Sequence, residues 1–312
     1  MDDRVLWSGG NNYLACYSSK EKIVDKLRMK TNFKYLLAAL ILCIGLVWAA
    51  VFQLPDNQLR LIFCNVGQGD AALIIYKNQQ ILIDGGPDVS VLSCLSKHMP
   101  FWDKTIEIMI LTHPHADHLT GLMDVIKRYR VLAFGSEKIE GSTGAYKELV
   151  RQLEKNRTKQ RFLYQDDKFL IKDGVILQTL WPTYEWAEQN PMKEGSLDIN
   201  SFSVIELLTY KNFKALFTGD AQALTLEKID SIIGKIDFLK VPHHSSKTGL
   251  NSEILNILYP KIAVISVGKN NKYGHPNPFT LELLKNLSIR TLRTDQVGDI
   301  EIISDGKTWK VK

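Results

Sequence analysis

Three histidines and one aspartate fall within six consecutive positions, His113 to His118, directly after an apolar run. Imidazole and carboxylate groups bind zinc, and also manganese or iron. A turn of this kind can direct His113 and His115 to one ion, and Asp117 and His118 to a second ion about 3.5–4 Å away. The alternative, a solvated polar loop, leaves unexplained why three of the chain's seven histidines gather here. The segment therefore predicts a metal site.

The remaining candidate ligands also follow strand-like runs. Asp220 follows one apolar run, His243 and His244 follow another, and His275 comes after a third. Side chains at the carboxyl ends of several strands can converge in one cleft. His98 is the one histidine outside this pattern, and we expect it on the surface of a helix.

Roles for these residues follow from their chemistry. A carboxylate has two oxygens, so Asp220 is predicted to bridge the two ions. Such a pair of cations lowers the pKa of water from 15.7 to about 7, which creates a nucleophile at neutral pH. One of His243, His244 and His275 is expected to complete the second ion, and another to protonate the leaving oxygen. His275 or His243 is the preferred ligand and His244 the preferred acid, so Asp117 and His244 are the predicted catalytic residues.

Other polar residues near these positions have two interpretations each. Asp70 and Asp84 either orient metal ligands or cap loops. The segment from Ser245 to Lys247 either holds a phosphate or forms a solvated turn.

Positioning this site requires two sheets. Short β-rich runs at Leu59–Cys64, Ala71–Tyr76 and Gln80–Ile83 predict an antiparallel meander. Later strands are expected at Ile106–Leu111, Val175–Leu180, Phe202–Thr209, Lys214–Thr218, Asp237–Lys240, Ile262–Ser266, Arg290–Arg293 and Asp299–Ser304. Helices are expected at Val89–His98, Asp117–Arg128, Gly144–Lys155, Ala221–Ile229, Ser252–Leu258 and Phe279–Leu287. The polar segment Trp181–Ser196 is expected to be a loop. Two successive halves of strands backed by helices predict an α/β fold, a four-layer αββα sandwich.

The N-terminal region predicts a membrane anchor. Residues 35–54 are uncharged, a length that matches the ~30 Å hydrocarbon thickness of a bilayer. Residues 1–34 form a basic tail, whereas the five residues after the span carry no cation. The positive-inside rule therefore places the tail in the cytoplasm and residues 55–312 outside. Two alternatives are a true start at Met29, with a misassigned tail, and secretion after cleavage near Ala49.

The net charge and the cysteines bear on nucleic-acid binding and on disulfide formation. The chain of 312 residues is 45% hydrophobic, enough for a globular core, and has a net charge of +5. The tail holds three of these five charges, so the outer domain is nearly neutral and its net basic signature is weak for a nucleic-acid binder, which leaves a local basic patch as an alternative. Cys64 and Cys94 share the outer domain without a CxxC pair, and we expect buried thiols rather than a disulfide.

Several motifs together resemble a known family. They are Phe63–Ala71 (FCNVGQGDA), Ile81–Gly86 (ILIDGG), His113–His118, Thr218–Asp220 (TGD), Leu239–Ser246 (LKVPHHSS) and Tyr273–Pro276 (YGHP). Their order is similar to that in metallo-β-lactamase-fold hydrolases, and more closely to that in the soluble C-terminal domain of the ComEC DNA-uptake family. The resemblance covers roughly Leu59 to Ile303.

What the resemblance implies is a metallo-β-lactamase fold with two divalent ions, zinc or manganese. The wider superfamily has a third histidine where this chain has Asp198-Ile199-Asn200-Ser201, so one ion is expected to bind more weakly, which favours manganese. ComEC itself carries a many-helix channel, whereas this chain has one predicted span and cannot be the channel.

Three functions are compatible with these observations. The preferred one is a membrane-anchored extracytoplasmic phosphodiesterase or nuclease that acts on DNA beside a separate channel protein. The second is a hydrolase of a cell-envelope phosphoester, an ester or a lactam, which the near-neutral outer domain favours. The third is a non-catalytic module for DNA translocation, which the missing third histidine allows but the presence of Asp117, His118 and Asp220 argues against.

Overall fold

The computed structural model of the chain describes residues 33–49, 51, 56–138, 144–191 and 198–312. The chain divides into two units, Met1–Leu54 and Pro55–Lys312, which are described separately. In the first unit residues 33–49 are helical. Among the residues that the structure describes, no helix has both the length and the apolar character needed to cross a bilayer. The predicted tail up to residue 32, and residues 50 and 52–54 of the predicted span, lie outside the described residues.

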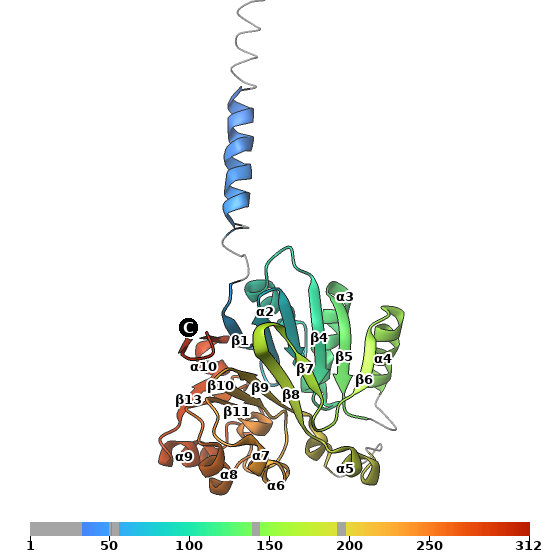
Figure 1. The fold of residues 1–312 in the computed structure, drawn as a ribbon, viewed down its shortest axis with the longest axis vertical. Helices are drawn as coiled ribbons and strands as arrows, with labels where there is room; N and C mark the ends of the chain where they lie inside the picture. The colour runs from blue at the N-terminus through green and yellow to red at the C-terminus, as the bar shows by residue number, and fades with distance from the viewer. Residues whose placement is uncertain (1–32, 50, 52–55, 139–143, 192–197) are drawn as a thin grey trace, which may run out of the picture. The chain divides into compact units, whose positions relative to one another are not determined.

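An eight-stranded sheet opens the second unit, in the order β15-β14-β1-β2-β3-β4-β5-β6 (Figure 1). Its strands are β1 (Leu59–Phe63), β2 (Ala72–Tyr76), β3 (Gln79–Ile83), β4 (Thr105–Leu111), β5 (Arg130–Ser136), β6 (Lys159–Phe162), β14 (Ile300–Ser304) and β15 (Trp309–Val311). The first three strands form the predicted antiparallel meander, which is confirmed. The strands from β3 to β6 run parallel.

A seven-stranded sheet follows, in the order β13-β12-β11-β10-β9-β8-β7. Its strands are β7 (Lys168–Leu170), β8 (Val175–Trp181), β9 (Ile205–Tyr210), β10 (Phe213–Phe217), β11 (Phe238–Lys240), β12 (Ile262–Ile265) and β13 (Arg290–Arg293). The strands from β7 to β10 are antiparallel, and those from β10 to β13 are parallel.

Side chains of both sheets alternate between two apolar layers. In β2, Ile74 and Tyr76 face the core shared by the two sheets, whereas Leu73 and Ile75 face the helices on the outer side. Successive side chains of a strand point to opposite faces of the sheet, so apolar residues at all of these positions bury the strand on both faces. The two sheets therefore pack face to face with helices outside, which confirms the predicted four-layer sandwich.

The outer helices divide between the sheets. Helices α2 (Ser90–His98), α3 (Ala116–Arg128) and α4 (Gly144–Lys155) cover the first sheet. The second sheet is covered by α6 (Ala223–Glu227), α7 (Asp230–Ile233), α8 (Ser252–Leu258) and α9 (Pro278–Asn286). Helix α10 (Thr294–Val297) connects β13 to β14.

Several elements were not predicted from the sequence. β5 follows α3 without a turn signal, and β6, β7 and β15 are short edge strands with exposed residues. The segment Trp181–Ser196, predicted to be a loop, contains helix α5 (Tyr184–Gln189). The hydroxyl of Thr183 accepts a hydrogen bond from Trp186 N and so caps this helix at its N-terminus.

Two expectations about the region around α2 are wrong. Cys64 and Cys94 form a disulfide, with Cα atoms 5.7 Å apart, because α2 packs directly over the end of β1. His98 is buried rather than exposed, because the segment leading into β14 passes the C-terminal end of α2. Its Nε2 atom lies 3.1 Å from Asp299 Oδ2.

Candidate metal centre

All seven predicted metal ligands, and the predicted acid His244, lie after the carboxyl ends of strands, where the two sheets meet. His113 and His115 follow β4, and Asp220 follows β10. Asp117 and His118 lie in the first turn of α3. His243 and His244 belong to the short 3-10 turn Pro242–Ser245 after β11, and His275 lies on the loop after β12.

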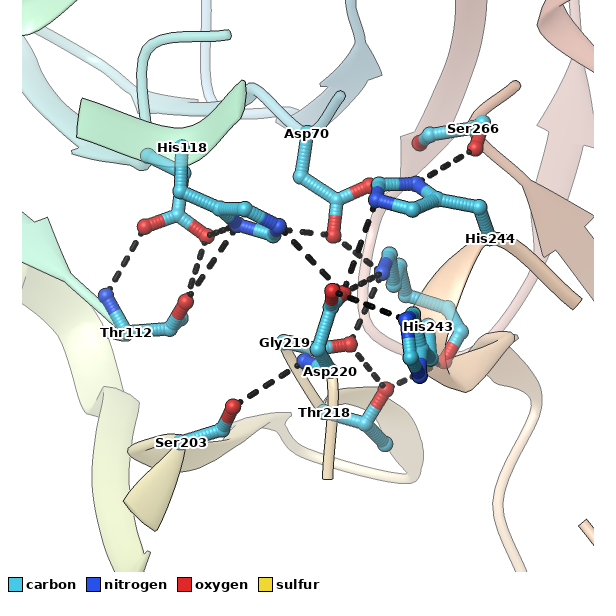
Figure 2. Close-up of polar contacts among 12 residues, drawn as sticks. Asp70, Thr112, His118, Ser203, Thr218, Gly219, Asp220, His243, His244 and Ser266 are labelled. Carbon is cyan, nitrogen blue, oxygen red and sulfur yellow. Dashed lines mark hydrogen bonds and ion pairs between the residues drawn. The ribbon is translucent and has the colours of Figure 1, made fainter. Parts of the chain in front are cut away.

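Asp220 occupies the middle of this group (Figure 2). Its Oδ1 atom lies 3.3 Å from His118 Nε2. Its other oxygen, Oδ2, lies 3.8 Å from Nε2 of both His113 and His243. The side chain is almost completely buried. One carboxylate thus faces two different sets of imidazoles, which is the geometry of a bridging ligand.

The first set of ligand atoms belongs to His113, His115 and Asp220, and these atoms lie within 4.8 Å of one another. His113 Nε2 and His115 Nδ1 are 3.0 Å apart. His243, in the turn after β11, faces the same oxygen of Asp220. Two nitrogens and one oxygen are therefore close enough to share an ion, a donor set typical of zinc or manganese.

The second set consists of Asp117, His118, Asp220 and His244, again with ligand atoms within 4.8 Å. His244 Nε2 lies 3.2 Å from Asp117 Oδ2 and 3.7 Å from Asp220 Oδ1. The other ring nitrogen of His244, Nδ1, lies 3.0 Å from the carbonyl oxygen of Ser266 and donates to it. This bond leaves the lone pair of Nε2 free to bind a cation.

Unsatisfied buried atoms test whether a cation fits this centre. His118 Nε2, His244 Nε2 and Asp220 Oδ1 are buried and have no hydrogen-bond partner among the described residues. Buried polar atoms are normally paired, because leaving one unpaired costs free energy. A cation between these three atoms would satisfy all of them, so the residues present fit a metal ion.

Electrostatics favour positive charge at the same point. Burial alone would lower the pKa of His244, but Asp220 and Asp70 raise it to about 10. Burial likewise opposes protonation of His118, yet Asp220 and Asp84 hold its pKa well above the usual value. Burial opposes ionisation of Asp220, but His244 and His118 keep its pKa well below the usual range. A divalent cation would occupy the position in which these carboxylates now favour protons.

The ligand His118 is oriented by a buried carboxylate. Asp84 Oδ2 lies 2.8 Å from His118 Nδ1 and accepts a hydrogen bond of 2.7 Å from Thr112 Oγ1. The backbone N–H of Thr112 donates to the other oxygen, Oδ1, at 2.8 Å. With Nδ1 donating to Asp84, the neutral ring of His118 would present the lone pair of Nε2 to a cation beside Asp220. Asp84 therefore orients a ligand, one of the two roles that the sequence allowed.

Asp70 and Lys240 form a buried ion pair beneath the second set of ligands. Lys240 Nζ also donates to the carbonyl oxygen of Gly219 at 2.9 Å and lies 3.9 Å from Asp220 Oδ1. Asp70 Oδ1 lies 3.4 Å from His244 Nδ1. Lys240 was not predicted from the sequence. Its position as the last residue of an apolar strand, three residues before His243, was the available signal.

Backbone geometry sets the positions of Asp220 and the two adjacent histidines. Gly219 has φ +50°, and a Cβ at this position would lie 2.9 Å from Thr112 Cβ. His243, His244 and Ser245 all have positive φ, at 48°, 51° and 68°. Three successive residues in this sparsely populated region cost free energy, which the surrounding structure must offset.

Other predicted residues lie around the rim of the centre. The ring centroid of His275 lies 5.6 Å from that of His243 and 6.2 Å from that of His244. Burial and the neighbouring His244 and His243 lower the pKa of His275 to about 4. The segment that replaces a third histidine forms a 3-10 turn, Ile199–Phe202, and the charge of Asp198 acts on His115.

A family model described as "Beta-lactamase superfamily domain" matches residues 79–248 of the chain. That range includes every candidate ligand except His275.

Curated relatives extend the match. ComE operon protein 3 of Bacillus subtilis is 26% identical over 281 residues, which cover 84% of this chain and 35% of the relative. Recombination protein 2 of Haemophilus influenzae is 26% identical over 268 residues, with 84% and 31% coverage. Competence protein ComA of Neisseria gonorrhoeae is 24% identical over 275 residues, with 84% and 35% coverage. The chain thus spans about a third of the length of these relatives.

Solved structures share the architecture. The metallo-beta-lactamase fold protein YhfI from Bacillus subtilis matches with a TM-score of 0.54 and 12% identity, over 80% of this chain and all of that one. A metallo hydrolase from the archaeon Ignicoccus hospitalis matches with a TM-score of 0.52 and 14% identity, over 78% of this chain and 98% of that one. At these identities the likeness concerns the fold.

Proposed function

The chain belongs to the beta-lactamase superfamily, and from this premise we propose that it is a metal-dependent phosphodiesterase that cleaves DNA outside the cytoplasmic membrane. The observation that carries the proposal is the position of Asp220, whose two oxygens face two separate sets of buried ligand atoms. Sites that hold two cations a few ångströms apart are common in phosphatases and nucleases.

The residues that would hold the cations follow from the distances. His113, His115 and Asp220 would hold the first ion, with His243 as a fourth ligand. Asp117, His118, Asp220 and His244 would hold the second. When bound, two divalent cations supply a lowered water pKa and neutralise the negative charge that develops during phosphodiester cleavage.

His244 thereby takes a different role from the one preferred in the sequence analysis. Its Nδ1 donates to Ser266 O, and its Nε2 faces Asp117 and Asp220, so we assign it as a ligand rather than an acid. His275 stands next to His243 and is neutral at pH 7, since its pKa is lowered to about 4. A neutral imidazole has one N–H donor, with which His275 would hold a phosphate oxygen of the substrate.

DNA is the proposed substrate because of the relatives. The names of two of them refer to recombination and competence, and the chain matches all three over most of its own length. We also propose that it works beside a separate channel protein.

Two features support an extracytoplasmic location. The disulfide between Cys64 and Cys94 is typical of oxidising compartments. Residues 35–54 are uncharged and follow a basic tail, which is the pattern of an anchor with its N-terminus inside. We propose that this segment holds the enzyme at the outer face of the membrane.

Metal content and cleavage measured together test the proposal. The purified chain should bind two divalent ions and should cleave single- or double-stranded DNA with manganese or zinc. Asp220→Asn should lose metal and more than about 100-fold of the activity, because it removes a ligand shared by both ions. Asp237→Asn is a change of the same kind, but Asp237 precedes β11, at the end of the strand opposite to His243. This variant should retain both the metal and the activity.

Other outcomes have definite meanings. If every metal fails to support cleavage of DNA but a chromogenic phosphodiester, ester or lactam is hydrolysed, the cell-envelope hydrolase is correct. A folded chain that binds no metal and hydrolyses nothing would indicate the non-catalytic translocation module.

A further inference from the structure

An exposed aromatic ring stands beside the metal centre. Tyr273 lies on the loop between β12 and α9, and 72% of its surface is exposed. Its ring stacks on that of His275, with centroids 5.9 Å apart and planes 25° apart. His275 in turn lies 5.6 Å from His243, which faces the bridging carboxylate of Asp220. The Tyr273 ring is therefore two side chains away from the ligand set and presents surface to solvent.

The loop that carries Tyr273 is held in place by one side chain. The amide nitrogen of Asn271 donates to the carbonyl oxygens of Gly268, at 3.0 Å, and His275, at 2.5 Å. Its amide oxygen accepts from the backbone N–H groups of Tyr273 and His275, both at 3.1 Å. Asn277 N donates to Ser245 O at 2.8 Å, which ties the loop to the turn that carries His243 and His244. The backbone that carries the ring is thus fixed before any ligand binds.

Three lysines belong to the same loop as Tyr273 or follow the turn to which that loop is tied. Lys269 and Lys272 flank it on the loop, and Lys247 follows the turn to which the loop is tied. All three are exposed, and none has an ion pair within the part of the chain that the structure describes. Lysines of this kind are available to neutralise phosphates.

Resting on the proposed function, we propose that Tyr273 is a stacking platform for an unpaired base next to the phosphate that is cleaved, which makes single-stranded nucleic acid the substrate. Every base has a π-face, so stacking on a tyrosine accepts any sequence. A base inside a duplex already stacks on its neighbours and cannot use the platform without being unpaired. A phosphoester without an aromatic group gains nothing from the ring.

A fluorescent base tests the stacking directly, without requiring cleavage. We would titrate the full metal-loaded chain with short single-stranded oligonucleotides that carry 2-aminopurine at one position in turn, with phosphorothioate linkages to slow hydrolysis. Stacking should quench the fluorescence at one position with wild type and with Tyr273→Phe. Tyr273→Ala should abolish the quenching and weaken binding by about 5- to 150-fold, the range measured for loss of one stacked base.

Tyr259 provides a matched control. It is 58% exposed and lies between α8 and β12, at the amino end of β12 and away from the metal centre. Tyr259→Ala should quench and bind as the wild type does. If Tyr273→Ala also quenches and binds as the wild type does, or if the wild type binds without quenching at any position, the platform does not exist. A wild type that binds no oligonucleotide has the same consequence.

Kinetics separate this inference from the proposed function. With an abasic strand of the same length, Tyr273→Ala should leave KM within about twofold, whereas KM for the normal strand should rise as binding weakens. Equal changes with both strands would overturn the inference. Quenching by a wild type that hydrolyses no phosphodiester would instead refute the nuclease and leave the stacking platform intact.

Discussion

The orientation of His118 by Asp84 gives a sharp test of the metal centre. Asp84→Asn keeps the shape of the side chain but replaces one oxygen with an NH₂ group. Oδ1 accepts from the backbone N–H of Thr112 at 2.8 Å, so the NH₂ group must take the position of Oδ2. There it would donate towards His118 Nδ1, which is 2.8 Å away. The imidazole proton would then move to Nε2, the atom that faces Asp220.

The expected loss follows from this change of tautomer. Removing an outer hydrogen-bond partner of a metal-bound histidine costs about 10- to 100-fold in metal affinity, or about 1.4–2.7 kcal/mol. We expect the upper end of that range, because Asp84→Asn turns the nitrogen that should accept the cation into a donor. The loss should be confined to one ion, since His118 belongs to only one of the two ligand sets.

Competition with a chromogenic chelator measures both affinities, and thermal unfolding of the metal-free chain reports whether the variant folds. Asp237→Asn is the matched control. Asp237 is also a buried carboxylate that accepts from a backbone N–H, that of Lys214 at 2.9 Å, and from Lys261 Nζ at 2.7 Å. It should lower stability without changing metal affinity. A folded Asp84→Asn chain that binds both ions as tightly as wild type would refute the assigned role of Asp84.

Three further changes should alter stability in ways that denaturant titration can measure. Replacing both Cys64 and Cys94 by serine should lower the free energy of unfolding by about 3–4 kcal/mol, since the disulfide closes a loop of 30 residues; equal stability with and without reductant would contradict this. Burial raises the pKa of Glu206 to about 8, so the folded carboxyl stays protonated while the unfolded one ionises. Stability should therefore fall by up to about 5 kcal/mol as pH rises from 4.5 to 8, and Glu206→Gln should remove that slope; an unchanged slope would place the effect elsewhere. Gly219→Ala should cost at least about 2 kcal/mol, because φ is +50° and the new Cβ would meet Thr112 Cβ at 2.9 Å; an unchanged unfolding midpoint would show that the turn can relax.

Much of the metal centre could be predicted because its residues obey one local rule. Each candidate ligand follows an apolar run that proves to be a strand, and carboxyl ends of neighbouring parallel strands meet at one edge of a sheet. The alternation of strands and helices was enough for the four layers, since each strand buries both faces. The motif resemblance to metallo-β-lactamase-fold hydrolases and to the ComEC family is confirmed by the family match and by the three relatives.

Contacts between distant segments could not be predicted in this way. The pairing of Cys64 with Cys94 depends on α2 lying over the end of β1, and the burial of His98 depends on the segment of Asp299, which comes 201 residues later. Lys240 is charged and ends an apolar strand, so its sequence context resembles that of a surface residue. Only the packing of the two sheets brings Asp70 against it and makes it part of the centre.

The positions of His243 and His244 in the sequence do not predict which of the two binds a metal ion more tightly. Adjacent residues in a regular strand point to opposite faces, which would place only one of them in the cleft. Here both have positive φ, so the chain turns and both rings reach Asp220, each facing a different oxygen.

The two histidines differ in the hydrogen bonding of the other ring nitrogen, Nδ1. His244 Nδ1 donates to Ser266 O, whereas His243 Nδ1 has no hydrogen-bond partner among the described residues. A histidine fixed from behind keeps one tautomer and makes the tighter ligand. The ion held by His244 should therefore be the last to leave as the chain is titrated with a chelator.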